Sequence, residues 1–118
     1  MKLSVGIITF NEERIIAKTI DAVKNIAGEI VIIDSNSTDK TVEIAKSKGA
    51  KVITQSWLGY GKQKNFMIDN CSGEWILSID ADEIISQELA NEISEEIKKE
   101  NNISEVYELR EKVVCFGK

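Results

Sequence analysis

Two aspartates separated by one residue, Asp80 and Asp82, follow an apolar stretch at residues 75–79. If the chain stays extended there, both side chains point to the same side, with Cα atoms about 6.5 Å apart. Hard oxygen donors of this kind suit Mg²⁺ or Mn²⁺, which proteins commonly hold through one or two carboxylates together with substrate phosphates. For the pair taken alone, an aspartate that merely caps the following turn is an equally good interpretation.

Polar residues also follow two other apolar stretches, at residues 3–9 and 29–34. Their side chains are suited to hydrogen-bond a base and a ribose, and they are Asn11, Glu12, Asp34, Ser37 and Asp39. The side chain of Asp39 could equally cap the helix that follows it, and the two roles are compatible. Ligands of open parallel sheets bind outside the carboxyl ends of the strands, so these residues and the two aspartates are expected at one edge.

Lys62 and Lys64 follow a Gly-Tyr-Gly bend, where a cation could approach a phosphate. A solvated helix face is the competing interpretation, and for these two residues alone it is the favoured one. Trp57 and Tyr60 could stack on a base or a sugar, or could simply close the edge of the sheet. The residues themselves leave that choice open.

Several chemistries are excluded by what the sequence lacks. The chain has no histidine, which removes Ser-His-Asp and Cys-His catalysis and His-ligated zinc. No Gly-x-Gly-x-x-Gly follows the first apolar stretch, and there is no P-loop. The net charge of −5 argues against general affinity for nucleic acid or an anionic membrane surface. No run of about 18 apolar residues is present.

The elements that must position these residues alternate between strand and helix. Strands are predicted at residues 3–9, 29–34, 51–54 and 74–80, with weaker candidates at 106–109 and 113–116. Helices are predicted at residues 12–25 with Asn11 as N-cap, at 41–48, at 62–70, and after Ser86, where Leu89, Ile93 and Ile97 form an apolar stripe. Such alternation predicts a three-layer α/β/α, Rossmann-like fold with a mostly parallel sheet.

Size and composition indicate one domain over residues 1–118. The 118 residues are 42% hydrophobic and 30% charged, which is enough to bury a core without a disulfide or a structural metal. The two cysteines, Cys71 and Cys115, form neither a metal-ligand spacing nor a disulfide framework. A reducing cytoplasm is therefore the expected location.

Four ordered segments resemble the successive motifs of family 2 glycosyltransferases, which have the type A (GT-A) nucleotide-sugar fold. They are residues 9–13 (TFNEE), 32–41 (IIDSNSTDKT), 61–65 (GKQKN) and 73–83 (GEWILSIDADE). The resemblance covers essentially the whole chain and is closest to the branch that adds sugars to the lipopolysaccharide core, of the β-1,4-glucosyltransferase type.

The resemblance implies a role for each matched position. Thr9 and Asn11 would line the nucleotide pocket with Glu12, Asp34 would lie by the uracil or ribose, and Asp80 would face the ribose and diphosphate. The implied donor-binding set is Thr9, Asn11, Glu12, Asp34, Ser35, Ser37, Asp39, Lys62, Asn65, Asp80 and Ala81, and the implied ligands of Mg²⁺ or Mn²⁺ are Asp82 and Asp80.

The implied activity is a metal-dependent, inverting transfer of a sugar from a nucleotide-diphosphate donor such as UDP-glucose to a saccharide or lipid-linked acceptor. It would take place in the cytoplasm or at the inner face of the cytoplasmic membrane. The family places its acceptor site and catalytic base beyond the Asp-x-Asp motif, so we expect this chain to carry donor binding alone and assign no catalytic residue. Ser35 stands where many members have a second aspartate, which leaves the identity of the base open.

Two other functions remain as alternatives at this point. One is a non-catalytic nucleotide-binding module. The other is a metal-dependent phosphotransferase that uses Asp80 and Asp82, although such enzymes usually place that pair on the first strand and here it closes the fourth. Peripheral membrane association and a homo-oligomer also remain open.

Overall fold

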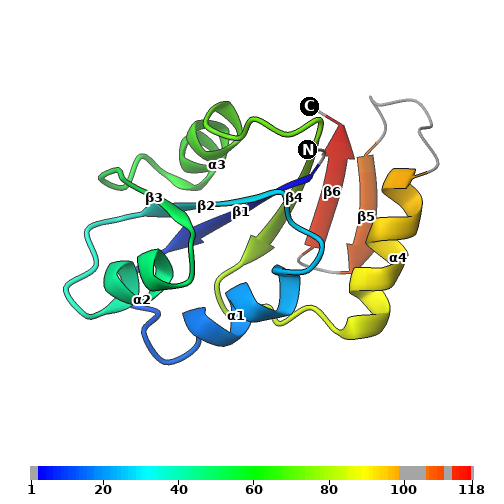
Figure 1. Ribbon diagram of the computed structural model, residues 1–118. Coiled ribbons are helices and arrows are strands. Elements are labelled where there is room, and N and C mark those ends of the chain that lie inside the picture. The colour runs from blue at the N-terminus through cyan, green and yellow to red at the C-terminus, as the bar shows by residue number, and fades with distance from the viewer. Residues whose placement is uncertain (1–2, 99–105, 111–112, 118) are drawn as a thin grey trace.

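The computed structural model describes residues 3–98, 106–110 and 113–117, whose strands form one six-stranded sheet (Figure 1). The strands are β1 (Leu3–Thr9), β2 (Glu29–Asp34), β3 (Lys51–Thr54), β4 (Trp75–Asp80), β5 (Val106–Arg110) and β6 (Val113–Gly117). The helices are α1 (Ile16–Val23), α2 (Thr41–Ser47), α3 (Tyr60–Asp69) and α4 (Gln87–Lys98). The predicted alternation of strand and helix is confirmed.

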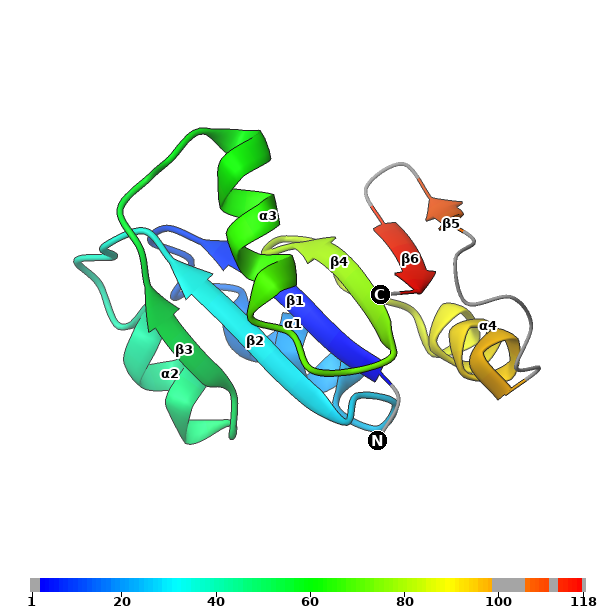
Figure 2. The same ribbon diagram turned by 90° about the horizontal axis from the view of Figure 1, so that it is seen from above.

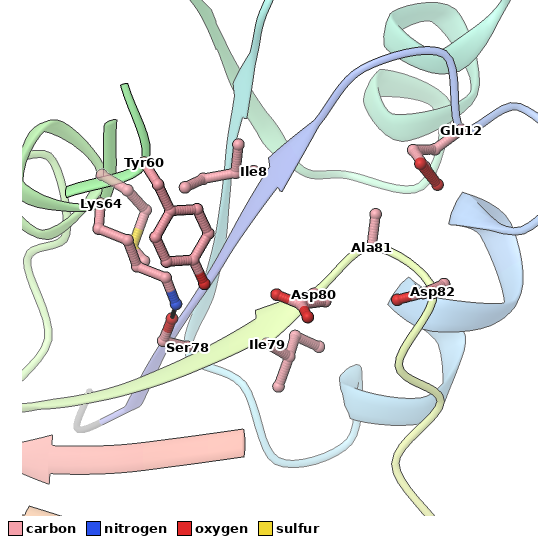
Figure 3. A pocket seen from close by; sticks show the side chains of 10 residues that line it. Ile8, Glu12, Tyr60, Lys64, Ser78, Ile79, Asp80, Ala81 and Asp82 are labelled. Atoms are coloured by element: carbon pink, nitrogen blue, oxygen red, sulfur yellow. Dashed lines mark hydrogen bonds between the residues drawn. The ribbon is translucent and has the colours of Figure 1, made fainter. Parts of the chain in front are cut away.

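The sheet has the order β3-β2-β1-β4-β6-β5. Its first four strands are parallel, while β6 runs antiparallel to β4 and β5 antiparallel to β6. The chain builds outward from β1 to β3 and then returns to place β4 on the other side of β1, so the winding reverses between β1 and β4. At the carboxyl edge the chain leaves these two strands in different directions (Figure 3). A reversal of this kind opens the crevice in which doubly wound sheets bind ligands.

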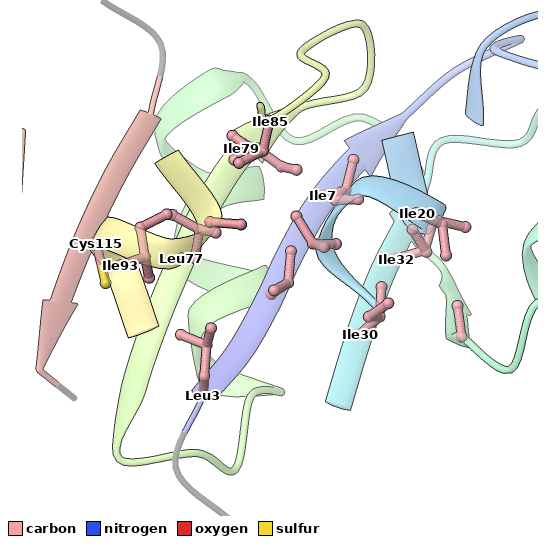
Figure 4. Close-up of a cluster of buried hydrophobic side chains, with 14 of the residues drawn as sticks. Leu3, Ile7, Ile20, Ile30, Ile32, Leu77, Ile79, Ile85, Ile93 and Cys115 are labelled. Carbon is pink, nitrogen blue, oxygen red and sulfur yellow. The ribbon is translucent and has the colours of Figure 1, made fainter. Parts of the chain in front are cut away.

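Helices cover both faces of the sheet, as the three-layer prediction requires (Figures 1 and 2). The larger core packs α1, α2 and α4 against one face, and Figure 4 shows part of it around Ile7, Ile20, Ile32 and Leu77. The predicted stripe of α4 is buried in that core. A smaller core on the opposite face joins Met67 of α3 to inward-facing strand residues. Burial of apolar surface on both faces is what stabilises this arrangement.

Helix α3 packs its Met67 side chain directly against Gly6 of β1. A Cβ atom at this position would lie 2.0 Å from Sδ of Met67 and 2.8 Å from its Cγ, so a larger residue would displace the methionine side chain. Met67 itself is buried. The contact is part of the smaller core that holds α3 on the sheet.

Two predicted helix starts are wrong. Helix α1 begins at Ile16 rather than residue 12, and Asn11 is not its N-cap: Ile15 holds that position, and Asn11 has a left-handed φ of 51°. The reason is that residues 11–13 bond to the following loop instead of starting a helix. Helix α3 begins at Tyr60, two residues before the predicted 62, directly after Gly59 with its φ of 96°. The Ser86 cap of α4 is confirmed by a 3.1 Å bond from the Leu89 N–H.

Both cysteines are free thiols and buried. Burial raises the pKa of the Cys115 thiol to about 12, so it stays protonated at neutral pH. Among the described residues, every helix is too short or too polar to span a bilayer.

Candidate functional site

A pocket of about 320 Å³ opens where β1 and β4 end, at the point where the winding of the sheet reverses (Figure 3). It combines three acidic side chains with one lysine, and its lining residues are Ile8, Glu12, Tyr60, Lys64, Met67, Ser78, Ile79, Asp80, Ala81 and Asp82. Four of the residues predicted to bind the donor or a metal thus meet in one hollow: Glu12, Asp80, Ala81 and Asp82.

The chain does not stay extended through Asp80 and Asp82. Asp80 is the last residue of β4, and a 3.0 Å bond from the Glu83 N–H to the Asp80 carbonyl closes a turn. The turn is fixed to α1, because the buried Thr19 hydroxyl donates a 2.5 Å bond to the Ala81 carbonyl. Both carboxylates line the pocket through this turn rather than through the side-chain alternation of an extended strand. Thr19 is therefore a positioning residue that the sequence pattern did not reveal.

Glu12 also lines this pocket. Burial, followed by the negative charges of Asp82 and Asp39, raises its pKa. Mutual repulsion among carboxylates is what a bound cation would relieve. In the part of the chain that the structure describes, no group of three or more His, Cys, Asp or Glu is placed to hold an ion by itself. The donor set therefore fits Mg²⁺ or Mn²⁺ only if a ligand such as a diphosphate supplies further oxygens, as is common for these ions.

Lys64 brings a positive charge into the same pocket. Its ammonium group donates a hydrogen bond to the Ser78 hydroxyl on β4 and lies 5.5 Å from the centre of the Tyr60 ring. The other two predicted residues of this helix, Lys62 and Asn65, are exposed and do not line the pocket. The structure thus places Lys64, rather than Lys62, where it could reach a phosphate.

Asp34 is the centre of a buried network at the ends of β1 and β2. It is only 1% exposed, and its Oδ1 atom accepts bonds of 2.6 Å from both the Thr9 and the Ser37 hydroxyls. Its Oδ2 atom accepts the Ser37 N–H at 2.8 Å, and Ser37 Oγ in turn accepts the Asn11 N–H. These predicted donor-binding residues bond to one another, and their contact with a donor stays a prediction.

Hydrogen bonds of the Asn11 and Asp39 side chains join the loop that follows β1 to the loop that follows β2. The Asn11 side-chain oxygen accepts the N–H groups of Thr38 at 2.8 Å and Asp39 at 3.3 Å, which explains why Asn11 adopts its left-handed conformation. Asp39 accepts two bonds from Thr41, at 2.9 Å from the N–H and 2.5 Å from the hydroxyl. Desolvation alone would raise the pKa of Asp39, but these bonds and one from the Glu13 N–H lower it.

A second hollow, of about 390 Å³, lies beside the first along the same edge and is almost wholly apolar. It is lined by Phe10, Ser35 and Trp57, and both aromatic side chains are 57% exposed. We call it the aromatic slot. Phe10 was missed as a site residue because one aromatic between polar neighbours gives no signal until the loop bearing Trp57 is placed opposite it.

Comparison with known proteins identifies the family. Residues 4–113 match the family described as Glycosyl transferase family 2. The chain belongs to this family. An uncharacterized glycosyltransferase of Rickettsia typhi is 55% identical over 92 residues, which are 78% of this chain and 32% of that protein. The lipopolysaccharide core biosynthesis glycosyltransferase LpsC of Rhizobium meliloti is 38% identical over 94 residues, covering 75% of this chain and 34% of that protein.

Solved structures of glycosyltransferases share the fold. Residues 1–349 of Staphylococcus aureus TarS align with a TM-score of 0.72 and 28% identity over 84% of this chain and 33% of that chain. Glucosyl-3-phosphoglycerate synthase of Mycobacterium tuberculosis in complex with UDP aligns with a TM-score of 0.63 and 28% identity over 70% of this chain and 34% of that chain. Another structure of that synthase contains Mn²⁺ and UDP. The predicted family and GT-A fold are confirmed, and the chain spans about a third of the length of these relatives.

Proposed function

We propose that this chain is the donor-binding part of a glycosyltransferase that moves a sugar from a nucleoside diphosphate to a saccharide or lipid-linked acceptor. The observation that carries the proposal is that Asp80, Asp82 and Lys64 line one pocket at the reversal point of the sheet. Carboxylates for a cation and an ammonium for a phosphate are both needed where a diphosphate binds. Family membership favours glycosyl transfer over phosphoryl transfer at this pair of aspartates.

The two adjacent hollows match the two ends of such a donor. The aromatic slot lies over the ends of β1 and β2, and Phe10 and Trp57 provide flat apolar surfaces on which a base can stack. The acidic pocket lies over the ends of β1 and β4. A nucleotide laid along this edge would place its base in the slot and its diphosphate beside Asp80.

Asp82, together with Asp80, would hold Mg²⁺ or Mn²⁺ beside the diphosphate. When bound, the ion would supply positive charge to a leaving group that becomes more negative as the glycosidic bond breaks. Lys64 would add a second positive charge from the opposite wall of the pocket. The turn at Asp80 is held by the bond between Thr19 and Ala81, so the carboxylates are positioned before the donor arrives.

The class of acceptor is proposed from the name of one relative and from the chemistry of the transfer. The relative LpsC is named for lipopolysaccharide core biosynthesis, and we propose a saccharide of that class, with inverting stereochemistry. An inverting transfer needs a carboxylate that deprotonates the acceptor hydroxyl, and we assign none within this chain. Such an acceptor is met in the cytoplasm at the inner face of the membrane, which is the location we propose.

Calorimetry with UDP tests the proposal directly. We expect UDP to bind in the presence of Mn²⁺, with much weaker binding in EDTA and in Asp82→Asn. The matched control is Asp69→Asn, an exposed carboxylate of α3 outside the pocket, which should bind like the unmodified chain. Folded protein that binds none of UDP, ADP, GDP and CDP, or that binds its nucleotide equally after Asp82→Asn, contradicts the proposal. Comparison of UDP with ADP, GDP and CDP identifies the base.

A non-catalytic nucleotide-binding module would give the same calorimetric result. The two functions are separated by incubating the chain with UDP-glucose, Mn²⁺ and a saccharide acceptor and measuring released UDP. Release of UDP supports transfer or donor hydrolysis. Binding without release supports a donor-binding role alone, as the sequence predicts.

A further inference from the structure

Gln63 is a polar side chain that is completely buried, with 0% exposure, on the first turn of α3. A buried primary amide is costly unless its donors and acceptor are satisfied. Its Nε2 group donates to the Ser35 hydroxyl at 3.0 Å and to the Gln55 carbonyl at 3.1 Å. Its Oε1 atom accepts the Leu58 N–H at 3.1 Å. All three bonds reach outside α3, so the side chain connects segments rather than supporting its own helix.

The three partners lie in segments that surround the aromatic slot. Ser35 directly follows β2 and lines the slot, and Leu58 is the neighbour of Trp57, which lines it from the other side. Gln55 follows β3, where its own N–H bonds to the Asp34 carbonyl at 2.9 Å. Gln63 therefore contacts one wall of the slot and the backbone next to the other, although it does not line the slot itself.

The exposure of Trp57 makes this connection important. A large aromatic side chain that is 57% exposed gains little from packing, so burial alone does not hold its loop in one place. A further hydrogen bond to this loop, from the Asn36 side-chain amide to the Ser56 hydroxyl, is solvent-exposed. The buried hydrogen bonds of Gln63 are less subject to competition from water than the bond between Asn36 and Ser56.

We propose that Gln63 is a positioning residue that fixes the distance between Ser35 and Trp57 and so preorganises the aromatic slot for a nucleobase. The assignment of a base to the slot rests on the proposed function. Holding the loop before binding removes the entropy cost of ordering it with the ligand. Loss of the three bonds is therefore expected to weaken nucleotide binding although no contact with the nucleotide is removed.

Gln63→Met tests the proposal, because methionine has nearly the same length and suits a buried site but makes none of the three bonds. Acrylamide quenching of fluorescence reports mainly on Trp57, since the other tryptophan, Trp75, is buried, and Trp57→Phe identifies the signal. We expect altered Trp57 quenching in Gln63→Met and roughly tenfold weaker UDP binding through lost preorganisation. The control Asp69→Met, on the exposed part of the same helix, should change neither.

A Gln63→Met variant that is folded by circular dichroism and keeps both the Trp57 quenching and the UDP affinity overturns the proposal. Should it not fold, hydrogen exchange of the unmodified chain decides: a protected Leu58 amide supports the buried bond, and exchange at the rate of a free loop amide overturns it. Quenching and exchange need no ligand. A chain that binds none of UDP, ADP, GDP and CDP therefore counts against the proposed function, while the role of Gln63 in holding the loop is still decided.

Discussion

The Thr9 hydroxyl donates a 2.6 Å hydrogen bond to Oδ1 of Asp34, and the two residues are also Cα partners at the ends of β1 and β2. Both side chains are buried, at a position where the sheet meets the proposed donor site. A carboxylate in this position must be paired to be tolerated, so the bond stabilises the adjoining ends of β1 and β2.

Thr9→Val removes this donor while keeping the shape of the side chain. We expect the free energy of unfolding to fall by about 1–3 kcal/mol, because the buried carboxylate loses a hydrogen bond. Urea denaturation measures the change. Thr54→Val is the matched control: Thr54 is the partner of Asp34 on the other side, in β3, but it is exposed, and the variant should unfold like the unmodified chain.

Thr19→Val is expected to affect the metal-assisted site more than the fold. The substitution leaves the Ala81 carbonyl without the hydroxyl that now holds the turn between Asp80 and Asp82. UDP binding in the presence of Mn²⁺ should weaken several-fold, while UDP binding measured in EDTA should change little. Equal losses under both conditions would show that Thr19 acts on the fold alone.

Gly6→Ala should destabilise the chain through one close contact. The added Cβ atom meets Sδ, Cγ and Cε of Met67, all within 2.9 Å, so the buried methionine side chain must move. Overpacking of this kind costs about 1–3 kcal/mol, which urea denaturation would detect. In Gly61→Ala the new Cβ atom meets nothing within 4 Å, and that variant should be neutral or slightly stabilised.

The sequence was sufficient to predict the strands, the layers and the acidic edge, because these follow from local patterns. Apolar β-branched runs mark buried parallel strands, and Asp80 and Asp82 follow one such run. The predicted start of α1 is wrong because the Asn11 side-chain oxygen accepts N–H groups of another loop. This contact is long-range, so the neighbouring residues in the sequence do not indicate it.

The choice between Lys62 and Lys64 shows the same limit. On a helix, residues two apart point about 200° apart, so only one of the two can face the pocket. Which one does so depends on the face of α3 that is buried on the sheet, the face bearing Met67, and sequence spacing does not report it. Gln63, between two lysines, gives the pattern of an exposed residue and yet is buried, since its partners come from the segments that follow β2 and β3.

The lowered pKa of Glu29 predicts that the chain loses stability in acid. Burial would raise its pKa, but bonds from the Ser4 hydroxyl at 2.5 Å and from Ser72, together with the charge of Lys51, lower it. A lowered folded-state pKa means that the stabilisation is present above the unfolded value and is lost as the pH falls through the folded value. Glu29→Gln should lose about 1–2 kcal/mol at pH 7 and converge with the unmodified chain in acid.

Urea denaturation between pH 3 and pH 7 measures this convergence. Glu92→Gln, at an exposed position in the middle of α4, is the control and should follow the unmodified chain at every pH. A Glu29→Gln variant as stable as the unmodified chain at pH 7 would mean that the bonds to Ser4 and Ser72 contribute nothing net.

The raised pKa of Glu12 predicts the opposite pH dependence of stability. Burial and the charges of Asp82 and Asp39 raise its pKa above the usual 4.5, so ionisation is harder in the folded chain than in the unfolded one. The contribution of Glu12 to stability is complete below its pKa in the unfolded chain and is lost as the pH rises through its pKa in the folded chain. Glu12→Gln should therefore be more stable than the unmodified chain at pH 7, by on the order of 0.5 kcal/mol, and equal to it near pH 4.

Mn²⁺ added together with a saturating nucleoside diphosphate extends this test to the proposed metal site. A cation held near Asp82 would offset the repulsion between Asp82 and Glu12, so the melting temperature of the unmodified chain should rise more than that of Glu12→Gln. The comparison is made with and without EDTA at pH 7. An equal rise in both proteins would place the bound ion away from Glu12, and no rise on adding Mn²⁺ to either nucleotide-bound protein would contradict a cation held in this pocket.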